Sequence, residues 1–422
     1  MPILSSPPLF SKPSRPWGCA ILSFISGGLA VIALIAAAYF GIRMFDISGR
    51  MPTRQPKSVI ELAEKFSEER KQHAQDKRSD EKLLVDTMYA RQQIDPDCSL
   101  DFLLISGGGG KGAFGTGFLL GWSTIAPGAG ALPKFQGVSG VSAGAFIAPF
   151  AFLGTSADLA TVDGLFRDPK PDWLVPRGTF FFLPENVSLA TMPGLERNLQ
   201  KQFNLEFAKR IELAGSDNRV LLIQATNIDT GNGIDFDFVA AARKAVATND
   251  TNNLSQILLA SAAIPGAFEP REIQGSLYAD GGIISSFFDV GAPIRDEHNS
   301  FGAVWKREHP NAPIPKTRYW VIINEYIQPT AEIVQPLWPT MMARSLYISM
   351  RFAATMMLRH LYAKAKLTKA LNHGDVEVRW VAISPNWKPL NDAFFDQATM
   401  RNLSDEGKGV GADANSWMTT AP

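Results

Sequence analysis

A serine between two glycines is the residue of this chain best placed to act as a nucleophile. Gly140 to Gly144 read G-V-S-A-G, after an apolar run and before helix-forming residues. Between a strand and a helix, G-x-S-x-G predicts a nucleophile elbow, a tight turn that exposes the serine Oγ. The helix that begins there directs its N-terminal dipole toward any anion beside Ser142. The pattern therefore predicts a nucleophilic serine.

A glycine-rich loop lies upstream of this serine. Residues 102–117 read FLLISGGGGKGAFGTG, an apolar run followed by glycines and one lysine. When such a loop follows a strand, its backbone N–H groups can bind a nucleotide phosphate or an oxyanion that forms during a reaction.

The nucleotide interpretation requires features that are missing from the sequence. Gly110 to Gly115 match G-x-G-x-x-G, but a dinucleotide site needs an acidic residue about 20 positions later. No Asp or Glu occurs between Asp101 and Asp158. A phosphate-binding loop of the G-K-[ST] type is excluded because Gly112 follows the lysine. We therefore predict no nucleotide cofactor.

The base that would activate Ser142 is either an aspartate or a histidine. Asp280-Gly281-Gly282 follows a short apolar run at 276–279, so its carboxylate would lie on a glycine turn at a strand end. The alternative role for Asp280 is to cap a bend as an Asx-turn residue. A Ser-Asp-His triad also stays open, because four histidines follow the serine: His298, His309, His360 and His373.

Together the three segments resemble the patatin-like phospholipases. That family carries a D-G-G-G-x-[RK]-G loop, a G-x-S-x-G serine and a D-G-[GA] aspartate in this order. Here the loop reads S-G-G-G-G-K-G from Ser106 to Gly112, with serine where the family often has aspartate. Residues 225–236 and 260–270 are also similar to segments of the family, and the resemblance covers residues 100–385.

The resemblance implies a Ser-Asp dyad in a three-layer patatin-like domain that needs no cofactor. Ser142 would attack an ester carbonyl, Asp280 would accept its proton, and water would hydrolyse the acyl-enzyme. Lys111 would carry positive charge near the oxyanion or a lipid phosphate, or else form a structural ion pair. The N–H groups implied to surround the oxyanion are those of Gly108, Gly109 and Gly110. The glycines that support the turns are Gly107, Gly112, Gly140, Gly144, Gly281 and Gly282.

Charge and composition argue against several other classes. The 41 Lys and Arg residues balance 41 Asp and Glu residues, so no basic field indicates a nucleic-acid partner. The two cysteines, Cys19 and Cys98, allow neither a disulfide framework nor a cysteine-based zinc site. The five histidines show no H-E-x-x-H or similar spacing, so we predict no metal.

The elements that must position these residues alternate between short apolar runs and helical stretches. This alternation predicts an α/β domain at 99–391 with a mostly parallel central sheet. The expected strands are 102–105, 135–138, 220–225, 276–279, 319–324 and 378–383. The expected helices include 117–123, 143–152, 252–262 and 341–371. The methionines of the last helix (Met342, Met350, Met356 and Met357) favour a packing surface over a lipid-contact stripe.

The N-terminal part predicts a membrane anchor after a tail at 1–16. Residues 17–42 contain no charged residue, and as a helix they would extend about 39 Å, enough to cross a hydrocarbon core of about 30 Å. A cleaved signal peptide is the alternative, but its apolar region usually spans only about 7–15 residues. The excess of Lys and Arg after the span places the catalytic domain in the cytoplasm.

Two further segments are expected to lie outside the catalytic domain. Residues 43–98 are dense in charge and predict a solvated helical connector. Residues 392–422 are polar and contain glycine, and predict a frayed tail. The whole chain thus predicts a single-pass membrane-anchored serine hydrolase acting on membrane lipid esters: phospholipid, lysophospholipid or neutral lipid. The alternative is a patatin-fold scaffold or lipid-binding protein without turnover.

Overall fold

The structure is a computed structural model that describes residues 30–41, 60–61, 64, 67–68, 82–128, 130–178, 186–285, 300–391 and 393–422. The chain divides into two compact units. The smaller unit comprises residues 1–56 and 182–186, and the larger comprises residues 57–181 and 187–422.

The predicted membrane span at 17–42 lies largely outside the described residues. Of this segment the structure describes residues 30–41, which are helical. Among the described residues, no helix has both the length and the apolar character required to cross a bilayer. The tail at 1–16 and the first part of the connector, 43–59, also lie outside the described residues.

The larger unit is built on a mixed eight-stranded sheet with the order β10-β9-β1-β2-β5-β8-β7 and β6 paired with β5. Five neighbouring strands are parallel: β10 (Val376–Ala382), β9 (Lys316–Ile323), β1 (Ser99–Ile105), β2 (Gly137–Val141) and β5 (Val220–Asn227). Three antiparallel strands complete it: β6 (Asn232–Asp237), β7 (Arg271–Ile273) and β8 (Ser276–Asp280). A separate ribbon pairs β3 (Val175–Pro176) with β4 (Ala190–Thr191). The expected α/β fold with a mostly parallel sheet is confirmed.

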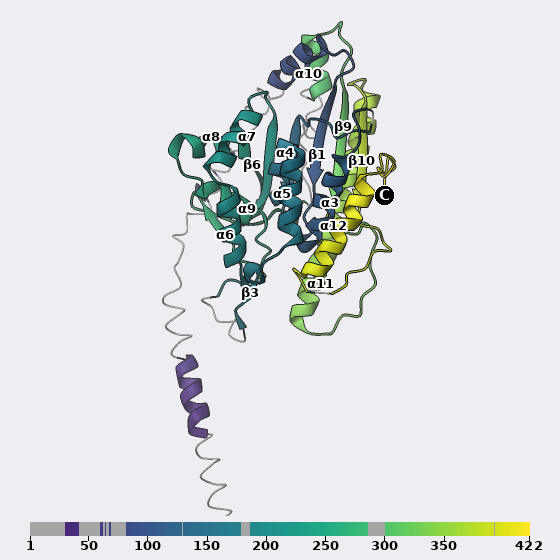
Figure 1. The fold of residues 1–422 in the computed structure, drawn as a ribbon. Helices are drawn as coiled ribbons and strands as arrows, with labels where there is room; N and C mark the ends of the chain where they lie inside the picture. The colour runs from purple at the N-terminus through teal and green to yellow at the C-terminus, as the bar shows by residue number, and fades with distance from the viewer. Residues whose placement is uncertain are drawn as a thin grey trace, which may run out of the picture. The chain divides into compact units, whose positions relative to one another are not determined.

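Helices cover both faces of the sheet, as Figure 1 shows. Successive side chains of β1 point to opposite faces of the sheet and enter two separate hydrophobic cores. Leu103 and Ile105 belong to the first core, and Phe102 and Leu104 belong to the second. Beside the first core lie α3 (Gly112–Trp122), α4 (Ala143–Leu153), α5 (Ser156–Arg167), α6 (Pro193–Gln202), α7 (Leu205–Ala214), α8 (Phe238–Thr248), α9 (Asn252–Ser261) and α12 (Gln397–Gly411). Beside the second lie the helix at 82–92, α10 (Phe301–Glu308) and α11 (Trp338–Ala370).

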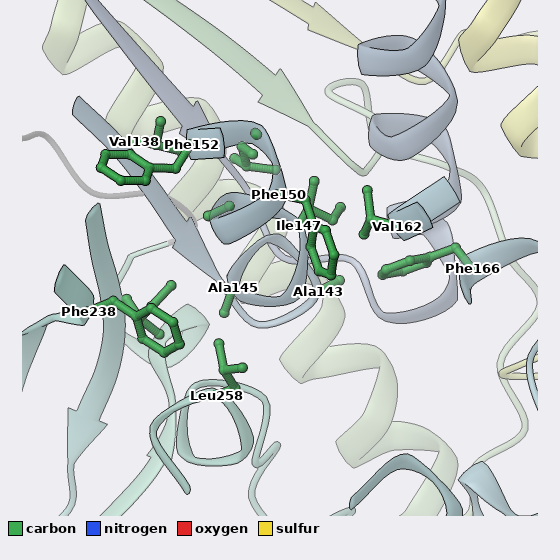
Figure 2. Packing of buried hydrophobic residues seen from close by; sticks show 14 of the residues in the cluster. Val138, Ala143, Ala145, Ile147, Phe150, Phe152, Val162, Phe166, Phe238 and Leu258 are labelled. Carbon is green, nitrogen blue, oxygen red and sulfur yellow. The ribbon is translucent and has the colours of Figure 1, made fainter. Parts of the chain in front are cut away.

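Helix α4, which follows the nucleophile motif, is buried within the first core. Its sequence AGAFIAPFAFL is apolar on every side, as expected for a helix surrounded by protein. Figure 2 shows Ile147 and Phe150 of this helix among the buried side chains that include Val162 and Phe166 of α5. This packing holds the start of α4 in place beside β2.

The end of the predicted connector is part of the larger unit, and one side of its helix is buried. Val85 and Met88 lie on the helix at 82–92 and are fully buried against the second core. Gln92 donates a hydrogen bond to the carbonyl oxygen of Pro313 at 2.9 Å. The charge density of the segment concealed the buried positions 85, 88 and 92, which are three and four residues apart and therefore share one side of the helix.

The prediction of a frayed tail at 392–422 is wrong, because α12 packs along α3. The helices touch through glycines: a Cβ at Gly117 would overlap the carbonyl oxygen of Ser404, and one at Gly407 would overlap that of Phe114. Small residues allow such close approach of two helix backbones. Beyond the helix, Trp417 packs against Trp122, with ring centroids 4.8 Å apart. The glycines of this segment therefore indicate tight packing.

This contact yields a prediction about stability with a matched control on one helix. We expect Gly407→Ala to lower the free energy of unfolding by about 1–3 kcal/mol, because the new methyl group meets the α3 backbone. Gly409→Ala, where no atom lies within 4 Å of the added carbon, should raise stability by about 0.5–1 kcal/mol through helix propensity. Urea unfolding of both variants measures the difference. Equal effects would show that the two helices do not meet through Gly407.

Candidate active site

Ser142 occupies a strained turn between β2 and α4. Its backbone dihedrals are φ 54° and ψ −120°, which non-glycine residues rarely adopt, and α4 starts at the next residue. Its side chain does not cap the helix that follows. A Cβ at Gly144 would overlap the carbonyl oxygen of Ile105, so this turn can close against β1 only with glycine. The structure thus contains the predicted nucleophile elbow.

The glycine-rich loop follows β1, the parallel neighbour of β2, so both turns lie at the same edge of the sheet. Gly108 has φ 154°, and a Cβ there would overlap the carbonyl oxygen of Asn324. Asn324 donates from its backbone N–H to Ser106 Oγ at 2.8 Å and from Nδ2 to Ser106 O at 2.9 Å. Ser106 Oγ in turn donates to the carbonyl oxygen of Gly107 at 2.8 Å. Serine in place of the family's usual aspartate is therefore fully hydrogen-bonded here.

The amide groups of this loop are directed by a short 3-10 helix at Gly109–Lys111, with Gly108 as its N-cap. The first N–H groups of a helix have no carbonyl partner within it, so they are available to an anion. Gly109 lines the same cavity as Ser142. Of the three glycines expected around an oxyanion, Gly109 is thus the one that borders the cavity, with Gly108 and Gly110 on either side.

Asp280 lies at the end of β8 and is buried, with 1% of its surface exposed. Because β8 is antiparallel to β5, Asp280 pairs with Ala225, while Val141 pairs with Gln224 on the other side of β5. The register therefore places the Asp280 carboxylate beside the turn that carries Ser142. Its Oδ1 accepts a hydrogen bond from the N–H of Gly282 at 2.7 Å.

Burial raises the pKa of the Asp280 carboxyl to about 6, although the Ser142 hydroxyl and the Gly282 N–H each lower it. The serine is thus close enough to stabilise the ionised carboxylate. The other oxygen, Oδ2, is buried without a hydrogen bond of regular geometry to any described residue. A contact that is loose without substrate and tightens in the reacting complex is common for a nucleophile and its base. The structure brings the two predicted residues together.

Ser261, at the end of α9, connects the turn of Ser142 to β5 and was not identified from the sequence. Its Oγ accepts the backbone N–H of Ser142 at 2.9 Å and donates to the carbonyl oxygen of Gln224 at 2.6 Å. The side chain is fully buried. Residues 260–270, which resemble a segment of the family, contain this serine, but only the three-dimensional contact reveals that it holds the backbone of Ser142.

Lys111 forms the structural ion pair that was one of its two expected roles. Its Nζ lies 2.7 Å from both carboxylate oxygens of Glu325. The same ammonium group lies 5.4 Å from the ring centroid of Tyr326 and 4.9 Å from that of Tyr347. These contacts hold the start of α3 against Glu325 and Tyr326, which follow β9, and against Tyr347 of α11.

The histidines do not supply a base in the described part of the chain. His309 stacks on Tyr89 with ring centroids 3.7 Å apart, and His373 faces the hydroxyl of Ser300 at 3.2 Å. His360 is exposed on α11. None of the three lines the cavity beside Ser142, and His298 lies outside the described residues.

An apolar cavity borders Ser142 and is partly open to solvent. Aromatic and aliphatic side chains dominate the wall, among them Phe146, Phe166, Leu195 and Phe268. Phe394 and Phe395, in the segment expected to be a tail, also line it. The cavity suits a long apolar chain attached to the group that reacts with the serine.

A serine on a strained elbow, beside a glycine loop and a buried carboxylate, is the arrangement of an enzyme that transfers acyl groups through serine. Residues 103–292 match the family model of the patatin-like phospholipases, which confirms the resemblance for this part of the chain. The chain also has similarity to the crystal structure of VipD from Legionella pneumophila, at 13% identity and a TM-score of 0.35. The similarity covers 74% of this chain and 66% of VipD. No curated protein matches the chain.

The role of Ser261 can be tested against a second serine of the same helix. Ser261→Ala removes the partner of two buried backbone groups, so we expect a loss of about 1–3 kcal/mol in unfolding free energy and slower labelling of Ser142 by a fluorophosphonate. Ser255 is also buried, but its Oγ has no hydrogen-bond partner among the described residues. Ser255→Ala should leave both measurements nearly unchanged. Equal labelling rates for the two variants would contradict the positioning role.

Proposed function

We propose that this protein is a serine acyl hydrolase that cleaves ester bonds of membrane lipids. The observation that carries the proposal is the approach of the Asp280 carboxylate to the hydroxyl of Ser142, a residue that lines an apolar cavity. The match of residues 103–292 to the patatin-like phospholipases supports lipid hydrolase activity. The proposal covers phospholipid, lysophospholipid and neutral-lipid substrates.

In the first half of the reaction Ser142 Oγ attacks the ester carbonyl, and Asp280 accepts the hydroxyl proton. The N–H groups of Gly108, Gly109 and Gly110 would stabilise the oxyanion of the tetrahedral intermediate, and each such donor is worth about 3–4 kcal/mol in related sites. The ester C–O bond then breaks, the alcohol leaves with the proton from Asp280, and the acyl group stays on the serine.

The second half repeats these steps with water as the nucleophile. Asp280 accepts a proton from water, the hydroxide adds to the acyl carbonyl, and the collapse of the intermediate returns the proton to Ser142. A base with a pKa near 6 is ionised at neutral pH and still accepts protons more readily than an exposed aspartate. This single carboxylate can therefore serve both halves without a histidine.

The cavity indicates that the acyl part of the substrate is the part that the enzyme binds most extensively. Its wall is almost entirely apolar, with Asn198 and Gln202 among its few polar members. A fatty acyl chain in this cavity would place its carbonyl carbon at Ser142. The apolar segment at 17–42 would keep a cytoplasmic catalytic domain near such substrates, because attachment raises their effective concentration.

We expect Ser142→Ala and Asp280→Asn each to reduce lipid hydrolysis by at least about 1,000-fold, because the nucleophile and its base act as a unit. Fluorophosphonate labelling should disappear in Ser142→Ala, and urea unfolding should show that both variants are folded. His360→Ala, at an exposed position, serves as the control and should keep full activity. Full activity of Asp280→Asn together with loss in a histidine variant would indicate a triad. Absence of wild-type labelling would favour the scaffold without turnover.

The pKa of Asp280 predicts the pH dependence of the reaction. The base must be ionised, so kcat/KM for a soluble ester should rise with pH through about 6 and level off above it. Below that value it should fall about tenfold for each pH unit. Initial rates at fixed ionic strength, corrected for spontaneous hydrolysis, measure the profile. A rate that stays level down to pH 4 would exclude Asp280 as the base.

A further inference from the structure

Helix α11 presents a ridge of large apolar side chains to solvent along its first five turns. The ridge consists of Trp338, Met341, Met342, Ile348, Phe352 and Met356, each between 44% and 62% exposed. At 100° per residue these positions fall on one side of the helix. Large apolar side chains that gather on a surface mark a site of interaction with a protein or a membrane.

The fold uses the opposite side of the same helix. Ala354, Leu358 and Leu361 are buried against the second core. Of the methionines expected to pack, Met357 packs against this core, but Met342 and Met356 belong to the exposed ridge. The expectation of a packing surface is therefore wrong for these two methionines, whose side chains are exposed.

The positive charge of α11 indicates which kind of surface would complement the ridge. Between Trp338 and Ala370 the helix carries six Lys and Arg residues and no Asp or Glu. Arg344 is paired with Glu332 and Lys369 with Asp375. Arg359, which donates a hydrogen bond to the carbonyl oxygen of Pro422, and Lys366 lie exposed beyond the ridge. An amphipathic helix with large apolar residues and basic neighbours matches the surface of an anionic bilayer. The six positive charges also make α11 unsuited to crossing that bilayer.

The helix that carries the ridge also contacts the candidate active site. Helix α11 follows β9, so its first turns lie beyond the edge of the sheet where Ser142 and Asp280 meet, at the end opposite α10 in Figure 1. A Cβ at Gly282 would lie 2.5 Å from Met350 Cε, which shows that α11 contacts the turn that carries Asp280. Other exposed apolar residues near this turn and the cavity are Ile283, Ile284 and Phe394.

We propose that α11 docks the larger unit on an anionic lipid bilayer, with the ridge inserted at the boundary between headgroups and acyl chains. A second copy of this chain is disfavoured as the occupant, because two such helices would bring their positive charges together. The docked orientation brings the turn that carries Asp280 close to the surface that holds the substrate. In this respect the inference rests on the proposed function, although the docking itself requires no turnover.

The first experiment measures insertion in the full chain without catalysis. Ser142→Ala prevents hydrolysis of the vesicles, while Cys19→Ser and Cys98→Ala remove the natural thiols. An NBD fluorophore is attached at Met341→Cys or Phe352→Cys on the ridge. The control is Leu213→Cys on α7, which is 75% exposed and apolar but precedes β5 at the other end of the sheet. Any effect of the N-terminal segment is common to all three proteins.

With vesicles of phosphatidylglycerol and phosphatidylcholine, we expect NBD at 341 and 352 to shift to the blue and to be quenched by spin-labelled lipid. The label at 213 should show neither change, and pure phosphatidylcholine or high salt should weaken the response at the ridge. Equal responses at all three positions, or none at the ridge, would overturn the proposal. A blue shift that appears without vesicles as protein concentration rises would identify a second copy as the occupant and would also overturn it.

The second experiment separates docking from chemistry. In the protein with its native Ser142, we expect Met341→Glu combined with Phe352→Glu to lower the ratio of vesicle-lipid to soluble-ester hydrolysis by at least about tenfold. An unchanged ratio would contradict a role of the ridge in reaching the substrate. If the wild type hydrolyses neither substrate, the proposed function fails, while the insertion measurement still decides whether α11 binds the bilayer.

Discussion

The site depends on turns whose glycines approach neighbouring backbone more closely than a side chain would permit. The elbow at Gly144 closes against the end of β1, and the loop at Gly108 lies against the carbonyl group of Asn324. Such contacts exclude water from the backbone groups between them, so each group must find a partner within the protein. Ser261 and Asn324 supply these partners from distant parts of the chain. The precision of the site therefore derives from backbone contacts and buried hydrogen bonds together.

The same exclusion of water gives Asp280 its chemical character. In water an aspartate is a weak base, and here desolvation strengthens it while the Gly282 amide and the Ser142 hydroxyl oppose that change. The cover over this turn includes Met350 of α11. One helix thus covers the turn that carries Asp280 on its packed side and exposes large apolar side chains on the other.

Local sequence patterns predicted the parts of the fold and site that local physics determines. The elbow, the glycine loop and the aspartate turn each depend on adjacent residues, and the buried parallel strands appear as continuous apolar runs. The partners of these turns were missed because Ser261 lies 119 residues from Ser142, and Asn324 lies 218 residues from Ser106. The glycines of α12 were misinterpreted because the same residue type marks both frayed chain and close helix packing.

The exposed ridge illustrates a different ambiguity. A helical stripe of apolar residues has one period whether it faces a protein core or lipid, so periodicity alone could not identify the partner of Met342 and Met356. The short antiparallel strands β6 and β7 were also absent from the sequence prediction, since runs of three to six half-buried residues carry little signal. For these elements the decisive information is burial, which depends on the whole domain.

The raised pKa of Asp280 makes its contribution to the free energy of folding depend on pH. A shift from 3.8 to about 6 corresponds to about 3 kcal/mol of folding free energy, present below the unfolded-state pKa and lost as pH rises through about 6. The contribution of this one carboxyl group to folding is therefore smallest in the ionised state that the proposed reaction requires. For Asp280 alone, protonation favours the folded state and opposes turnover.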